Sequence, residues 1–188
     1  MTCIVALVHD NISYIGGERG ASNDEMIWHT AKPKVWRDKG YLFGYAGSFS
    51  IEKLKHNFDP PAPPSSASDS EIDEFMNTTF IDALKDLYEE LDISKKDAGL
   101  VIVVNNRIFI HNSEDMSATM LNSNYFADGT GSSYAVGSLY TSEQLVEKWF
   151  PAKDRVCLAL EAAIQFSPSC SGDIDVISTE NWDWENDL

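Results

Sequence analysis

The chain has 188 residues, 43% of them hydrophobic and 23% charged, which is typical of a single globular domain with a full hydrophobic core. The net charge of −16 argues against binding to nucleic-acid backbones or anionic membrane surfaces, because both attract Lys and Arg. Three cysteines at unrelated spacings favour a reducing cytosol, and no stretch reads as a signal peptide or a transmembrane helix, so we predict a cytoplasmic protein.

The first part of the chain predicts two β-hairpins. Residues 2–9 are mostly apolar, as in a strand that is buried on both faces, and a turn at Asp10 and Asn11 leads to a second strand at 12–17. Residues 34–37 and 41–46 predict the second pair of strands, joined by a turn at 38–40.

Helices are expected next. Residues 50–58 carry apolar side chains at helical spacing, and residues 59–70 form a Pro- and Ser-rich connector. Ser70 and Asp73 approximate a capping box for a longer helix up to residue 91. Its apolar face shows the clearest helical period in the chain and consists of Ile72, Phe75, Met76, Phe80, Leu84, Leu87, Tyr88 and Leu91.

The second part repeats this order of strands and helices. A hairpin is predicted from strands at 99–104 and 107–111. The sequence then predicts helices at 132–140, 142–150 and 154–166, a closing strand at 173–179 and an acidic tail at 180–188.

Strands, helices, strands, helices and a final strand do not form the βαβ alternation of a parallel sheet. The order predicts an α+β fold, a four-layer αββα sandwich with two antiparallel sheets inside and helices outside, in a single domain over residues 1–188. A two-layer α+β fold is the alternative.

Thr2 is the first candidate for chemistry. Initiator methionine is commonly removed before a residue as small as Thr, and removal would leave the Thr2 hydroxyl and a free α-amine on the same residue. This pair provides a nucleophile and a base. A lysine nearby would lower the pKa of the amine, a carboxylate would orient the lysine, and a glycine N–H would stabilise an oxyanion. The four histidines show no spacing typical of a zinc site.

Three segments supply these residue types in order. Residues 16–22 read Gly-Gly-Glu-Arg-Gly-Ala-Ser, residues 32–35 read Lys-Pro-Lys-Val, and residues 45–47 read Tyr-Ala-Gly. With Thr2 at the start, this pattern resembles the proteasome β-subunit family, most closely its bacterial two-component (HslV-type) protease branch. The family pattern runs Thr, apolar strand, Gly-Asp-x-x-Ala-Thr, Lys-Val and Ala-Gly, without a gap in spacing from Thr2 to Glu18 or to Lys34.

The resemblance continues in the second half. Residues 129–135 look like the family's Gly-Ser-Gly-x-x-Tyr-Ala, and residues 171–176 look like the HslV-type Ala-Gly-Asp-Ile-Cys-Val. Only the connector and the acidic tail fall outside it. Two positions depart from the family pattern: Glu18 replaces the usual Asp and adds a methylene group, and Pro168 stands where many proteasomal subunits have a second Asp.

The resemblance implies an N-terminal nucleophile hydrolase that cleaves peptide bonds. Thr2 would be the nucleophile and, through its amine, the general base, while Lys34 would tune that amine. Glu18 would orient Lys34, Gly47 would donate to the oxyanion, and the hydroxyl of Thr130 could relay a proton.

Further expectations follow from the same resemblance. The backbone carbonyls of Gly172, Asp175 and Ser178 would hold a hard cation such as Na⁺, Mg²⁺ or Ca²⁺, although no cofactor is required for the reaction. The chain would form homo-oligomeric stacked rings around a chamber, act on polypeptides and receive them from an AAA+ unfoldase ATPase, without nucleic-acid or membrane partners.

Two other functions stay open from the sequence. Retention of Met1 would convert the Thr2 amine into an amide, which leaves a catalytically inactive ring or scaffold subunit. An N-terminal nucleophile amidase that acts on small amides is the third hypothesis.

Overall fold

The structure is a computed structural model and describes residues 2–23, 25–93, 98–145 and 150–180. Its strands are β1 (Cys3–His9), β2 (Ile12–Glu18), β3 (Gly20–Ser22), β4 (Ile27–His29), β5 (Val35–Asp38), β6 (Tyr41–Gly47), β7 (Ala98–Val104), β8 (Arg107–Asn112), β9 (Ser117–Met120), β10 (Tyr125–Gly129) and β11 (Ile174–Ser178). Its helices are α1 (Ile51–Asn57), α2 (Asp69–Phe75), the π-helical turn η1 (Met76–Phe80), α3 (Ile81–Glu90), α4 (Ser132–Leu145) and α5 (Ala152–Phe166).

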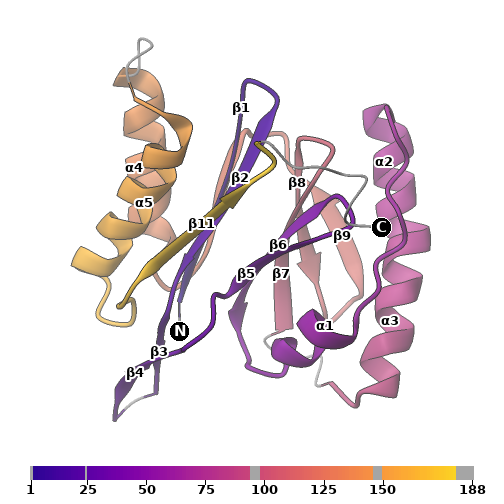
Figure 1. Cartoon of the computed structure of the whole chain (residues 1–188), viewed down its shortest axis with the longest axis horizontal. Coiled ribbons are helices and arrows are strands. Elements are labelled where there is room, and N and C mark those ends of the chain that lie inside the picture. Colours follow the sequence, from indigo (N-terminus) through magenta and orange to yellow (C-terminus); the bar gives the residue numbers. More distant parts are fainter. Residues whose placement is uncertain (1, 24, 94–97, 146–149, 181–188) are drawn as a thin grey trace.

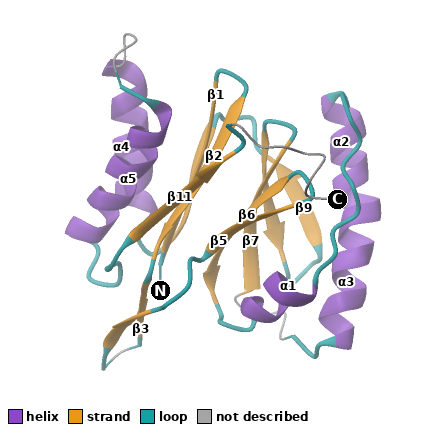
Figure 2. Cartoon of the chain, in the orientation of Figure 1, coloured by secondary structure: helices purple, strands orange, loops and turns teal. Residues whose placement is uncertain are grey.

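Two antiparallel sheets form the middle of the molecule. One has the strand order β10-β1-β2-β11 and the other has the order β5-β6-β7-β8-β9. Helices α4 and α5 cover the outer face of the first sheet, and α1, α2 and α3 cover the outer face of the second (Figure 1). Figure 2 shows the resulting order of layers, helix, sheet, sheet and helix. The predicted four-layer sandwich is therefore confirmed.

Each boundary between layers has its own hydrophobic cluster. Cys3, Val5 and Leu7 of β1 pack with α4 and α5, whereas Ile4 and Ala6 face the second sheet. Alternate side chains of one strand point to opposite faces, so β1 contributes to two clusters at once. This explains why its sequence is almost continuously apolar. Cys3 is accordingly a fully buried core residue.

The structure differs from the predicted elements in four places. The hairpin of β3 and β4, and the strands β9 and β10, were not predicted. The helices predicted at 132–140 and 142–150 are one helix, α4, over Ser132–Leu145, while residues 146–149 lie outside the described residues. Ser142, the first residue of the second predicted helix, lies inside α4, where its hydroxyl donates to the Leu139 carbonyl oxygen at 2.9 Å.

The predicted helix cap is also wrong. Ser68, not Ser70, caps α2: the Ser68 hydroxyl accepts from the N–H of Glu71, and the Glu71 carboxylate accepts from the N–H of Ser68 at 2.8 Å. Ser68 has extended backbone, which a capping residue requires, whereas Ser70 already lies inside the helix. The helix predicted up to residue 91 is continuous in space but contains the π-helical turn η1, which was not foreseen. No helix in the described ranges is both long and apolar enough to cross a bilayer.

His111 links stability to pH. Its side chain is buried in β8, its Nδ1–H donates to the Ser117 carbonyl oxygen at 3.1 Å, and burial lowers its pKa to about 4. The unfolded chain therefore binds more protons between pH 6.5 and 4, so stability falls as pH drops through this window. We expect the His111 contribution to amount to about 3 kcal/mol. Urea unfolding at pH 7.5 and 4.5 should show this loss in the wild type and a smaller one in His111→Phe. Equal losses would contradict it.

Candidate active site

The sheet topology brings the ends of several strands to one place. Ile4 pairs with Gly17, and Cys3 pairs with Gly129, so the start of β1 lies between the ends of β2 and β10. Thr2 precedes β1, Glu18 ends β2 and Thr130 follows β10. Lys34 directly precedes β5 on the facing sheet. Four of the five predicted catalytic residues are thereby gathered around the beginning of the chain.

Two charged side chains are hydrogen-bonded to the Thr2 hydroxyl. Thr2 Oγ1 is hydrogen-bonded both to Oε1 of Glu18 and to Nζ of Lys34. The three residues are almost completely buried, with 2%, 0% and 3% of their surfaces exposed. A hydroxyl buried between a carboxylate and an ammonium group is a strongly polarised nucleophile candidate, because electrostatic interactions strengthen away from water.

Both carboxylate oxygens of Glu18 accept hydrogen bonds. Oε1 accepts from the N–H of Cys3 at 3.0 Å and from Lys34 Nζ at 3.4 Å, in addition to the Thr2 hydroxyl. Oε2 accepts from the N–H groups of Gly20 and Ser171, the latter at 3.2 Å. These donors come from four separate segments, so the carboxylate is fixed in position.

Lys34 makes one hydrogen bond with each of its three hydrogens. Besides Thr2 and Glu18, its Nζ donates to the carbonyl oxygen of Gly20. Burial lowers the pKa of Lys34, and the charge of Glu18 and its hydrogen bond act in the opposite direction. Lys34 Nζ is thus held out of water, beside the candidate nucleophile, by a carboxylate.

The backbone of Thr2 is fixed from the other side. Its carbonyl oxygen accepts from the Thr130 hydroxyl at 3.4 Å and from the N–H of Gly131 at 3.4 Å. Gly129 has a positive φ of 90°, and a Cβ at this position would lie 2.2 Å from that same carbonyl oxygen. Only glycine therefore allows this close approach of β10 to Thr2.

Gly129→Ala is expected to displace Thr2 and to destabilise the fold by roughly 1–3 kcal/mol or more, because it adds backbone strain to a steric clash. Gly137→Ala is the matched control, since nothing lies within 4 Å of the added methyl group and Ala favours the helix. Thermal unfolding should show a lower melting temperature for the first variant and an unchanged or higher one for the second. A wild-type melting temperature for Gly129→Ala would refute the steric argument.

Gly47 lines the open side of the site. A small cleft next to the Thr2 hydroxyl is formed by Ala21, Tyr45, Gly47 and Phe49, together with Gly20 and Lys34. Gly47 stands at the end of β6 with a positive φ of 115°, a conformation that favours glycine, and its lack of a side chain leaves the backbone open at the cleft. Three of the five predicted catalytic residues, Thr2, Lys34 and Gly47, thus line this cleft. Glu18 and Thr130 do not line it but are hydrogen-bonded to Thr2.

Two contributors were missed from the sequence. Gly20 receives Lys34 on its carbonyl and gives its N–H to Glu18, and Ser171 gives its backbone N–H to Glu18. Both lie in the motif segments, but they act through backbone groups, which have no side-chain signature. Gly20 carries one indirect signal, since a Cβ there would lie 2.5 Å from Oε2 of Glu18.

The residues of the predicted cation site, whose backbone carbonyls would be the ligands, lie in and just before β11. Gly172 precedes β11, Asp175 and Ser178 lie in it, and the Asp175 carboxylate is paired with Arg19 at 2.7 Å. The Asp175 carbonyl lies 3.1 Å from where a Cβ of Gly16 would stand, so it faces β2. The cation site stays a prediction.

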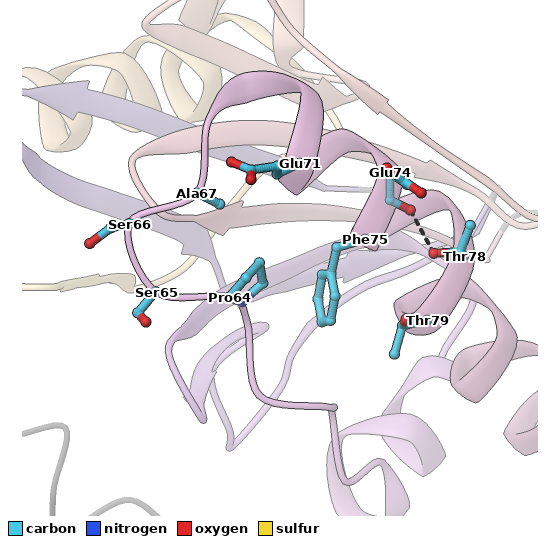
Figure 3. Close-up of a pocket in the computed structure, with 9 residues that line it drawn as sticks. All are labelled: Pro64, Ser65, Ser66, Ala67, Glu71, Glu74, Phe75, Thr78 and Thr79. Carbon is cyan, nitrogen blue, oxygen red and sulfur yellow. Dashed lines mark hydrogen bonds between the residues drawn. The ribbon is translucent and has the colours of Figure 1, made fainter.

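A larger hollow lies elsewhere on the molecule. The connector residues 64–67 and the turns from Glu71 to Thr79 enclose about 400 Å³ (Figure 3). Its lining contains Ser, Thr and Glu but pairs no hydroxyl with a basic group, and the Thr78 hydroxyl donates to the Glu74 carbonyl at 2.7 Å. Size alone therefore does not identify the reactive site, and the smaller cleft at Thr2 remains the candidate.

Comparison with known proteins gives one kind of match. No protein-family model and no curated protein matches the sequence. Among solved structures, BPH from Thiobacillus denitrificans aligns with a TM-score of 0.70 at 20% identity, over 94% of this chain and 97% of that one. Eukaryotic HslV from Trypanosoma brucei aligns at 0.65 and 16%, over 94% and 98%. Anbu, an ancestral β-subunit from Yersinia bercovieri, aligns at 0.61 and 12%, over 94% and 81%.

The chain has a proteasome-like fold. Nearly full coverage of both chains includes the two sheets and both helical layers. At 12–20% sequence identity, this likeness shows the fold alone. Any chemistry depends on the residues of this chain.

Proposed function

We propose that the protein is a threonine-type endopeptidase of the HslV type that hydrolyses peptide bonds with Thr2, exposed by removal of Met1. The observation that carries this proposal is the contact of the Thr2 hydroxyl with both Lys34 Nζ and Glu18 Oε1 in a buried site. The proteasome-like fold supports it, because that fold places a nucleophile at the start of the same strand.

The reaction follows from the positions of these groups. The Thr2 oxygen attacks a peptide carbonyl carbon, and the negative charge that develops on the carbonyl oxygen faces the backbone of Gly47. Lys34 donates to the attacking oxygen throughout and stabilises its charge. Collapse of the tetrahedral intermediate releases the amine product and leaves an ester on Thr2, which water then hydrolyses.

Assembly into homo-oligomeric stacked rings belongs to the same proposal. Large apolar side chains are exposed on the hairpin of β3 and β4, where Met26, Ile27 and Trp28 have 61%, 55% and 39% of their surfaces exposed. Apolar surface of this kind marks contacts with other proteins. An enclosed chamber would restrict the peptidase to unfolded polypeptides, supplied by an AAA+ unfoldase in the cytoplasm.

Three measurements on the purified protein test the proposal. Intact mass is expected to show a chain without Met1, fluorogenic peptides are expected to be cleaved, and native mass is expected to show a large ring. A retained Met1 with a ring and no turnover would instead support an inactive scaffold subunit. Cleavage of small amides but not of peptides, without a ring, would support the amidase.

A further inference from the structure

We propose that Glu18 is the base that takes the hydroxyl proton of Thr2, in place of the Thr2 α-amine. This inference rests on the proposed function, since it names the proton acceptor for the same nucleophile. It gives Glu18 a direct role in addition to the one that the sequence predicts for it, the orientation of Lys34.

The Thr2 hydroxyl has a single hydrogen to donate. Oε1 of an ionised carboxylate has no hydrogen, so its contact with Thr2 Oγ1 must use the hydroxyl hydrogen. Thr2 is therefore the donor in this bond, and the proton already points at Glu18.

The contact between Thr2 and Lys34 must then run in the opposite direction. Because the only hydroxyl hydrogen is committed to Glu18, Lys34 Nζ donates to Thr2 Oγ1. Its other two hydrogens go to Glu18 Oε1 and to the Gly20 carbonyl, neither of which can donate. Lys34 is thus an ammonium group with three acceptors and has no lone pair to receive a proton.

The side-chain length of Glu18 fits this role. Its Oε2 is held by the N–H groups of Gly20 and Ser171, while Oε1 extends to the Thr2 hydroxyl and the Cys3 N–H. An Asp would withdraw the carboxylate by about 1.5 Å, one carbon–carbon bond. It would keep a negative charge near Lys34 but would lose the direct contact with Thr2.

The proton balance closes over the whole cycle. Glu18 takes the hydroxyl proton as the Oγ–C bond forms, and it gives this proton to the leaving amine as the C–N bond breaks. In the second half, Glu18 takes a proton from the attacking water and returns it to the Thr2 oxygen as the ester is cleaved. The Lys34 ammonium keeps its protons throughout.

Acylation of Thr2 by a β-lactone tests the proposal without requiring peptide turnover. The Thr2 oxygen attacks the lactone carbonyl, the ring C–O bond breaks, and the ring oxygen takes the proton from Glu18. Intact mass follows the rate. A rate that depended on a free α-amine would fall steeply as that amine is protonated between pH 8.5 and 6. The proposed mechanism does not use this amine, so the wild-type rate is expected to change less than about 3-fold over the same range.

Glu18→Asp is the discriminating variant, because it keeps the charge and shortens the reach. We expect it to acylate at least about 30-fold more slowly at pH 7, with a residual rate that now rises with pH as the amine takes over. Glu18→Gln has no carboxylate, so it should acylate no faster than this residual rate and with the same rise with pH. Thermal unfolding verifies that the variants are folded, and the wild-type pH profile needs no variant.

Each outcome decides one of the two proposals. A wild-type rate that falls about tenfold per pH unit below 7.5, or a Glu18→Asp protein that matches the wild type, would overturn the role of Glu18 alone. Acylation of Thr2 without cleavage of any peptide would overturn the peptidase and leave the Glu18 base standing. A wild-type Thr2 that is not acylated at any pH would overturn both.

Discussion

Thr2→Ala is expected to lower peptide turnover by about 10³-fold or more, because it removes the only atom that can form the ester intermediate. The methyl group of Ala leaves Lys34 and Glu18 in place, so the site stays charged but has no nucleophile. Turnover of a fluorogenic peptide, measured at saturating and at low substrate concentrations, provides the test.

Thr2→Ser is the matched control for this experiment. It retains a hydroxyl at the same position and should retain measurable turnover and acylation. Thr2→Ala should remain folded and melt roughly 3–12 °C below the wild type, since a lost hydrogen bond to a charged group costs about 1.5–3 kcal/mol. Thr2→Ser keeps the hydroxyl and should melt close to the wild type. Undiminished turnover in Thr2→Ala would place the nucleophile elsewhere and remove the basis for the proposed reaction.

Lys34→Met is expected to abolish activity and also to destabilise the protein by about 3–5 kcal/mol, because it leaves the buried Glu18 carboxylate without its cation. Methionine matches the length of the lysine stem, so packing is largely kept. The loss of turnover should be at least about 10²-fold, the usual effect of removing one donor to a developing charge.

A double variant separates the two effects of Lys34. In Lys34→Met with Glu18→Gln the buried charge is gone, so much of the lost stability should return while activity stays absent. Urea unfolding and peptide turnover measure the two properties independently. Equal stability of the wild type and Lys34→Met would show that Glu18 does not depend on Lys34 for its stability.

The elements with strong burial could be predicted from the sequence. β1 and β7 are apolar on both faces because each lies between another sheet and a layer of helices. The long amphipathic run through α2 and α3 predicts its own buried face for the same reason. In these segments the local pattern and the tertiary environment agree.

The missed elements depend on distant contacts. β4 is exposed along its whole length, with no buried face to give a pattern, and β10 is only partly buried beside β1. The continuity of α4 past residue 141 was also missed. Ser142 bonds to Leu139 within the helix and accepts from Arg155 at 3.2 Å, and the contact with Arg155 does not show in the sequence. Such elements form because they contact segments that are distant in the sequence.

In the candidate site, too, some residues could be predicted from the sequence and others could not. Thr2, Glu18 and Lys34 could be predicted because their side chains carry the chemistry and stand at strand ends. The contributions of Gly20 and Ser171 could not be predicted, since a backbone group looks the same at every position. The direct contact from Glu18 to Thr2 needed coordinates, because the sequence alone does not show how far the longer side chain reaches.

Gly17 and Gly44, which lie between the two sheets, limit the substitutions that this protein tolerates. A Cβ at Gly17 would lie 2.7 Å from Cδ1 of Ile4, and one at Gly44 would lie 2.7 Å from Cγ2 of the same side chain. Ile4 is two residues from Thr2, so a methyl group at either glycine would push on the strand that carries the nucleophile. Genetic screens for loss of activity should therefore return substitutions inside the sheet interface, far from any substrate, as readily as substitutions in the cleft.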